Sequence, residues 1–206
     1  LLQQCLLEQN LPPAALQVVT TSDRNAVTEL LKLEEQIDLI IPRGGEGLIR
    51  FVAEHSRIPV IKHYEGICHV YLDAGADLEQ GMAIALDSKC LMPEVCNAME
   101  TMLVHASMVP HLPAIVRAFG EHAVEVRGCA RTCATVPGMC PAPARDEDWQ
   151  TEYLDLTVSI RVVDSLDTAV GHINRYGSHH TDSIVTDSEQ RARRFVQSVD
   201  SGVVLV

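Results

Sequence analysis

Short runs of apolar, often β-branched residues alternate with amphipathic segments along almost the whole chain. The apolar runs predict strands at residues 16–20, 38–42, 59–62, 68–73, 99–105, 123–128, 156–163, 182–186 and 202–206. The amphipathic segments predict helices near residues 24–34, 46–56, 76–90, 109–121, 165–175 and 188–199. Strands that are apolar on both faces and alternate with helices are typical of a parallel sheet with helices on each side. The predicted class is therefore α/β.

Polar residues that can cap a helix support three of the predicted helix starts, because their side chains accept hydrogen bonds from the first free backbone amides. The pairs are Ser22 with Asp23, Asp164 with Ser165, and Asp187 with Ser188.

The segment 129–150 interrupts this pattern. It contains three cysteines, three prolines and the single tryptophan of the chain, and it has no hydrophobic period. We therefore predict an irregular surface connection or lid there.

Composition and charge narrow the classes of partner. The chain has 206 residues, enough to bury a core, and no stretch of about 18 uncharged apolar residues that would predict a membrane span. Its formal net charge of −12 argues against nucleic acid, which is bound through clusters of Lys and Arg. A local basic pocket for a small anion stays possible.

The cysteine pattern favours reduced thiols over a disulfide framework. Seven cysteines is an odd number, and their spacing is irregular. Cys129, Cys133 and Cys140 lack the second close pair of a structural zinc site, so we predict no metal there. The chain opens in a helical pattern without an initiator methionine and closes on an apparent strand, so we expect a piece of a longer protein.

Two glycines follow a predicted strand in the segment IPRGGEGL, residues 41–48. Gly44 and Gly45 would present backbone amides at a helix N-terminus to phosphate, and Arg43 would add a positive charge. The alternating glycines of dinucleotide-binding folds are absent, however. The spacing by itself therefore favours an ordinary tight turn.

The segment DSKCLMPEVCNAMETMLVH, residues 87–105, holds two cysteines with Pro93 between them. Because Pro93 disfavours helical backbone at the preceding residue, the helix should end near Cys90. Cys96 then falls in a loop just before a strand, where a partly exposed thiol can be activated by nearby amides. The alternative is that Cys96 is a small buried apolar residue. The spacing leaves both interpretations open and slightly favours burial.

Taken together, these segments resemble the aldehyde dehydrogenase superfamily and, within it, the glutamate-5-semialdehyde dehydrogenase (γ-glutamyl phosphate reductase) family. The resemblance rests on DLIIPRGGEGL (38–48), IPVIKHYEGICHVYLD (58–73), DSKCLMPEVCNAMETMLVH (87–105), the long segment from Thr151 to Thr186, and RFVQSVDSGVVLV (194–206). Only residues 129–150 fall outside it.

The resemblance implies a two-part organisation and a set of site residues. Residues 1–64 would be the C-terminal part of an NAD(P)-binding domain, and residues 65–206 the cysteine-bearing catalytic domain. Cys96 would be the nucleophile. The cofactor NADP(H) would contact Gly44, Gly45 and Glu152, and the substrate or its phosphate would contact Arg43, Lys89 and Asn97.

The implied reaction is the NADPH-dependent reduction of L-glutamyl 5-phosphate to L-glutamate 5-semialdehyde in proline biosynthesis, through a thioester on Cys96. Relatives that hydrolyse the acyl group carry a water-activating glutamate upstream of the cysteine. The matching position here is Lys62, which agrees with a reductase that must avoid hydrolysis.

The resemblance further implies a small-molecule substrate, a homo-oligomer at full length, possible coupling to glutamate 5-kinase, and a cytoplasmic location. A mitochondrion or plastid is the alternative if the parent is a eukaryotic bifunctional enzyme. We expect the isolated piece to be inactive. The alternative functions are another aldehyde dehydrogenase superfamily oxidoreductase, or a non-catalytic Cys/His metal-binding or interaction module.

Overall fold

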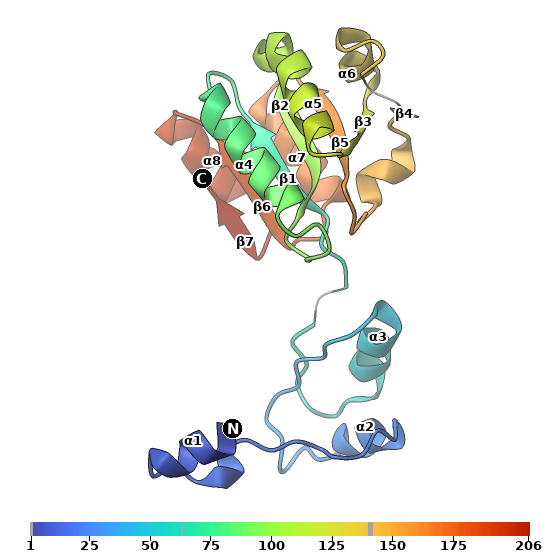
Figure 1. Ribbon diagram of the computed structural model, residues 1–206, viewed down its shortest axis with the longest axis vertical. Helices are drawn as coiled ribbons and strands as arrows, with labels where there is room; N and C mark the ends of the chain where they lie inside the picture. The colour runs from blue at the N-terminus through green and yellow to red at the C-terminus, as the bar shows by residue number, and fades with distance from the viewer. Residues whose placement is uncertain (1, 63, 140–141) are drawn as a thin grey trace. The chain divides into compact units, whose positions relative to one another are not determined.

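The computed structural model describes residues 2–62, 64–139 and 142–206. The chain divides into two compact units, Leu1–Lys62 and His63–Val206 (Figure 1). The assignment of the first unit to a nucleotide-binding domain stays a prediction. Cys140 lies outside the described residues.

The first unit consists of short helices joined by extended segments. The helices are α1 (Leu2–Glu8), η1 (Pro13–Ala15), α2 (Asn25–Leu30) and α3 (Glu46–His55). A small group of apolar side chains is buried in this unit: Leu31, Ile49, Val52 and Ile58. The two predicted strands at 38–42 and 59–62 are reduced to one parallel bridge between Ile40 and Val60.

The predicted strand at 16–20 does not form. Val18 and Val19 are 79% and 55% exposed, and the segment is extended without a described ladder partner. Strand-like composition produces a strand only where a neighbouring strand takes up its backbone hydrogen bonds. The sequence pattern could not show that this partner is missing among the described residues.

The described residues of the second unit form a seven-stranded parallel sheet. Its strands are β1 (Cys68–Leu72), β2 (Met99–His105), β3 (Glu125–Gly128), β4 (Ala142–Pro143), β5 (Thr157–Val163), β6 (Thr181–Val185) and β7 (Val203–Leu205). They lie in the order β4-β3-β5-β2-β1-β6-β7. The α/β class is confirmed, and six of the seven strands coincide with predicted ones.

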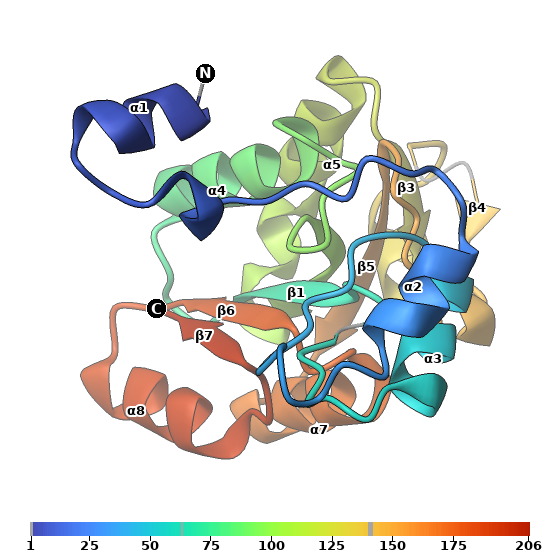
Figure 2. The same ribbon diagram turned by 90° about the horizontal axis from the view of Figure 1, so that it is seen from below.

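Helices cover both faces of this sheet. On one face lie α4 (Leu78–Cys90) and α5 (Leu112–Glu121), the latter preceded by η2 (Ala106–His111). On the other lie α7 (Leu166–Tyr176) and α8 (Glu189–Ser198), as Figure 2 shows. Among the described helices, none has the length and apolar character to cross a membrane.

Successive residues of the central strands enter opposite apolar layers. In β1, Leu72 packs in the layer under α4 and α5, whereas Tyr71 packs in the layer with α7 and α8. In β2, Met102 and Leu103 divide in the same way. Because side chains alternate across a strand, a sheet buried on both faces needs apolar residues at consecutive positions.

Two of the three predicted helix N-caps form as predicted, those of α7 and α8. The hydroxyl of Ser165 accepts from Thr168 N, and that of Ser188 accepts from Arg191 N. At α2 the N-cap residue is Arg24, and it forms no side-chain cap. Asp23 instead accepts from Asn25 N, 2.9 Å away.

The segment 129–150 is more regular than we predicted. It contains helix α6 (Ala130–Thr135), the two-residue strand β4 and the 3-10 helix η3 (Asp146–Gln150). β4 pairs with β3 at the sheet edge, and Asp148 accepts hydrogen bonds from Arg145 N and Arg127 Nη1, each at 2.6 Å. Elements this short show no hydrophobic period, so the pattern could not reveal them.

Candidate active site

Cys96 lies in the loop between α4 and β2. Helix α4 ends at Cys90, next to the end that Pro93 predicts, and the loop runs on to Met99, the first residue of β2. Cys96 is partly exposed, as a reactive thiol requires. The loop lies at the amino ends of the strands. The crevice of open α/β sheets usually lies at the carboxyl ends, so that rule does not locate this thiol.

The backbone of Cys96 is in direct contact with Gly66, in the segment that leads into β1. A Cβ atom at position 66 would lie 1.8 Å from the Cys96 carbonyl oxygen and 2.6 Å from its Cα. No other residue fits without moving one of the two backbones. Position 66 therefore requires glycine because of close backbone approach.

Two side chains anchor the segment around Gly66. Gly66 N donates to Glu152 Oε1 at 2.8 Å, and Ile67 N donates to Ser178 Oγ at 2.8 Å. Both acceptor residues are distant in the sequence: Glu152 precedes β5, and Ser178 lies between α7 and β6. The backbone beside Cys96 is thus held by segments that only the fold brings together.

A second thiol lies against the same loop. The Sγ of Cys68 donates to the Cys96 carbonyl oxygen at 3.3 Å and lies 3.9 Å from Nδ1 of His180. Cys68 is 2% exposed. Burial raises its pKa to about 12, against a smaller lowering by a backbone hydrogen bond at Thr181. Cys68 is therefore a protonated hydrogen-bond donor at neutral pH.

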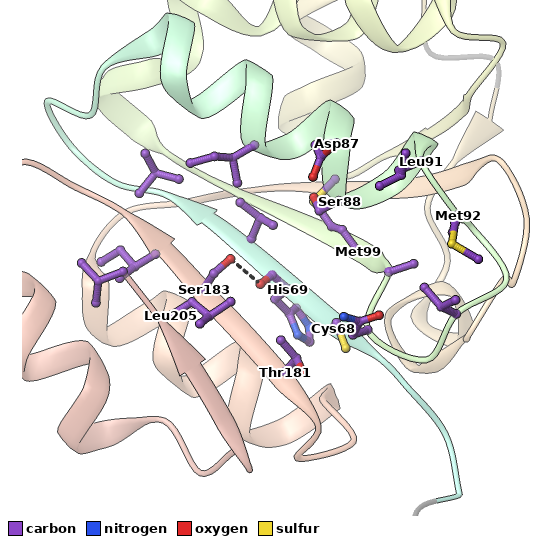
Figure 3. Close-up of a pocket in the computed structure, with 18 residues that line it drawn as sticks. Cys68, His69, Asp87, Ser88, Leu91, Met92, Met99, Thr181, Ser183 and Leu205 are labelled. Carbon is purple, nitrogen blue, oxygen red and sulfur yellow. Dashed lines mark hydrogen bonds between the residues drawn. The ribbon is translucent and has the colours of Figure 1, made fainter. Parts of the chain in front are cut away.

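A cavity of about 650 Å³ opens beside this loop (Figure 3). Both sequence neighbours of Cys96, Val95 and Asn97, line it. Most of the other lining side chains are apolar, and Ser88, Thr181 and Ser183 add hydroxyl groups. Such a cavity fits a short aliphatic chain with a few polar contacts.

Lys89, a predicted substrate contact, is buried against a carboxylate. Its side chain is fully buried, and Nζ forms an ion pair with Glu100 Oε2 at 2.7 Å. Burial raises the pKa of Glu100 to about 7, while the hydrogen bond from Lys89 opposes this rise. Glu100 Oε1 also accepts from Leu154 N. This arrangement gives Lys89 a structural partner, and its contact with the substrate or its phosphate stays a prediction.

The remaining predicted site residues are divided between the two units. Asn97 and Glu152 belong to the second unit with Cys96. Arg43, Gly44 and Gly45 belong to the first, where Gly45 is the N-cap residue of α3 and Arg43 is exposed.

Sequence reasoning missed the parts played by Gly66, Cys68 and Ser178. The glycine of the EGICH segment, directly before a strand, was a signal of close backbone approach, but not of the partner involved.

Cys129 and Cys133, the two described cysteines of segment 129–150, contact nearby protein groups. Cys129 Sγ lies 3.3 Å from Thr132 Oγ1, and Cys133 Sγ donates to Gly128 O at 3.3 Å. In the part of the chain that the structure describes, no three His, Cys, Asp or Glu residues are arranged as metal ligands.

Comparison with known proteins places these observations in a family. No model of a protein family matches the chain. The γ-glutamyl phosphate reductases of Xanthomonas oryzae and Salinibacter ruber are 50% and 53% identical to it over all 206 residues. The chain covers 49% and 47% of their lengths, so it spans about half of these curated relatives.

Solved structures agree. The crystal structure of γ-glutamyl phosphate reductase from Thermotoga maritima superposes with a TM-score of 0.89 at 39% identity, over 99% of this chain and 49% of that one. An acetylating aldehyde dehydrogenase from Geobacillus thermoglucosidasius, 15% identical, shares the fold with a TM-score of 0.73, over 99% of this chain and 53% of its own. The chain has an aldehyde dehydrogenase-like fold and belongs to the γ-glutamyl phosphate reductase family.

Proposed function

We propose that this chain forms part of an enzyme that reduces L-glutamyl 5-phosphate to L-glutamate 5-semialdehyde in proline biosynthesis, with release of phosphate. The observation that carries the proposal is the partly exposed Cys96, on a loop fixed by Gly66, in a chain half identical to γ-glutamyl phosphate reductases along its whole length. The proposal describes a cytoplasmic enzyme acting on a small molecule.

In this mechanism, Cys96 is the nucleophile. Its thiolate attacks the acyl carbon, a carbon–sulfur bond forms, and the phosphate group leaves with the electrons of the carbon–oxygen bond. The backbone N–H of Cys96 stabilises the oxyanion that develops. Asn97, exposed beside the cavity, would contact the substrate, and Arg43 would contact its phosphate.

The residues present suit a nicotinamide dinucleotide. Glu152 is partly exposed near the Cys96 loop, and a carboxylate has two oxygens, so its bond to Gly66 does not prevent a contact with a ribose hydroxyl. Gly44 and Gly45 precede a ten-residue helix, whose first amides suit a phosphate. When bound, NADP(H) supplies the hydride that turns the thioester into the aldehyde.

Substitution Cys96→Ser tests the proposal in the protein expressed from its complete reading frame. We expect the phosphate-dependent oxidation of glutamate 5-semialdehyde, the reverse reaction, to fall by at least about a thousand-fold, because an alcohol is a far weaker nucleophile than a thiolate.

The matched control is Cys90→Ser, since Cys90 packs against the apolar core at the end of α4 and contacts no reacting group. It should keep its activity and lose stability at most. Near-normal activity in Cys96→Ser would show that the nucleophile lies elsewhere. A panel of other aldehydes tests whether the substrate is the semialdehyde.

A further inference from the structure

Glu152 contacts the protein in a way that its expected role in cofactor binding does not explain. Its Oε1 accepts a hydrogen bond from Gly66 N, and Gly66 is buried directly against the backbone of Cys96. We propose that Glu152 is a positioning residue, which acts through Gly66 to fix the backbone of Cys96 for attack on the acyl group. This inference rests on the proposed function of Cys96.

The contact between Gly66 and Cys96 transmits position without a side chain. The Cβ direction of Gly66 points at the Cys96 carbonyl oxygen, and an added carbon atom would lie 1.8 Å from it. The two backbones therefore touch, so a movement of Gly66 toward Cys96 pushes that residue, and a movement away from it removes its support. A shift of the reacting atom by about 1 Å is enough to cost about a hundred-fold in rate.

Glu152 is well placed to prevent such a displacement, because its own segment is fixed on the following side. Leu154 N donates to Glu100 Oε1 at 3.4 Å. The hydroxyl of Tyr153 lies 2.8 Å from Ser159 Oγ, in β5. The residues that follow Glu152 are thus hydrogen-bonded to β2 and β5, which fixes the position of its carboxylate beside Gly66.

Gly66 depends on this bond more than an exposed amide would. Gly66 is buried, and a buried peptide N–H that loses its acceptor is left without water to replace it. The neighbouring bond from Ile67 N to Ser178 Oγ holds the next residue and does not satisfy Gly66 itself. Removal of the Glu152 acceptor therefore frees the residue that touches Cys96.

Three substitutions at position 152 distinguish the effect of side-chain length from the effect of side-chain charge. They are made in the protein expressed from its complete reading frame. Glu152→Gln keeps an oxygen at the same reach but removes the charge. Glu152→Asp keeps the charge but withdraws the carboxylate by one methylene, and Glu152→Ala removes both. We expect Gln to lose less kcat than either of the other two variants, because its oxygen can still accept from Gly66 N. We expect Asp and Ala to lose at least about tenfold in kcat, beyond any rise in the KM for NADPH that comes from the lost ribose contact.

Amide hydrogen exchange gives a second readout that needs no catalysis. Without cofactor or substrate, residues 91–98 should exchange faster in the Asp and Ala variants than in the wild type, and at the wild-type rate in the Gln variant. Ser178→Ala, which loosens Ile67 only, serves as the folding control and should show a smaller increase.

Three results would overturn the inference. These are normal kcat in the Ala variant, loss of kcat in Gln but not in Asp, and an effect confined to the KM for NADPH. If the wild-type protein showed no reductase activity, the proposed function would fail, while the exchange rates would still decide whether Glu152 fixes this loop.

Discussion

At the scale of single residues, two neighbouring cysteines, Cys96 and Cys68, differ in exposure and therefore in reactivity. Cys96 is partly exposed in its loop, whereas Cys68 is 2% exposed at the start of β1 and donates its S–H to the carbonyl of Cys96. Burial raises the pKa of Cys68 to about 12, so its thiolate is rare at neutral pH. Reactivity toward electrophiles should therefore distinguish the two sharply.

Limited alkylation with iodoacetamide at about pH 8 measures this difference. We expect Cys96 and the exposed Cys5 to be modified within minutes and Cys68 to stay intact, because a thiol with a pKa of about 12 is ionised in only about one molecule in ten thousand at that pH. Peptide mass mapping identifies the modified sites. In denaturant all seven cysteines should react. Modification of native Cys68 as fast as Cys96 would show that the Cys68 thiol is accessible in solution and not buried.

Residue types and spacing could identify Cys96 as a candidate, because Pro93 marks the end of the helix and a loop follows. They could not identify the ion pair that Lys89 forms. A lysine in the last turn of a helix usually faces solvent or a ligand. Its buried partner, Glu100, lies on β2. Only the packing of α4 against β2 brings Lys89 and Glu100 together.

At the scale of elements, the Lys89–Glu100 pair joins α4 to β2 across the loop that carries Cys96. Lys89 is 0% and Glu100 1% exposed. A buried pair of this kind stabilises little relative to apolar residues of the same shape, but it is costly to break, because the remaining charge has no water. The pair therefore fixes how helix and strand enter the loop.

Lys89→Met should lower the free energy of unfolding by about 3–5 kcal/mol, because it leaves the buried Glu100 carboxylate without its opposite charge. The double substitution Lys89→Met with Glu100→Leu should recover most of that loss. Urea-induced unfolding measures both. The matched control is Lys32→Met, whose partner Glu29 is well exposed, and which should cost less than about 1 kcal/mol. Equal effects at positions 89 and 32 would contradict the structural role.

The strands and helices of the second unit could be predicted because their sequences carry a strong period or a continuous apolar run. Met99–His105 is a strand over the predicted range. Residues 16–20 have a similar composition and form no strand, because a strand depends on neighbours that the sequence does not name. The two residues of β4 are held by pairing with β3 and by no pattern of their own.

At the scale of the whole second unit, Asp73 ties the sheet to the helix layer at the carboxyl ends of the strands. It follows β1, accepts from Thr186 Oγ1 at 2.8 Å beyond β6, and forms an ion pair with Arg191 of α8. Burial by itself would raise the pKa of Asp73. The hydrogen bonds from Arg191 and Thr186 outweigh this and hold the pKa below its ordinary value.

This lowered pKa predicts a loss of stability in acid. The folded protein binds the proton more weakly than the unfolded chain, so the stabilisation by Asp73 is fully present above about pH 4 and is lost as the pH falls through the lower folded pKa. We expect the difference in free energy of unfolding between the wild type and Asp73→Asn to shrink as the pH is lowered from about 5 to about 3. A difference that is constant over this range would mean that Asp73 does not titrate with folding.

The strand order also sets the sequence of events when the chain is made from its amino end. β1 and β2 follow one another along the chain and are direct partners, so they can pair once both have emerged. Among the described strands, β3 pairs only with β4 and β5, and β5 lies between β3 and β2. Until β5 has been synthesised, β3 has no route into the sheet. Before that point the backbone of β3 lacks the strand that joins it to β2.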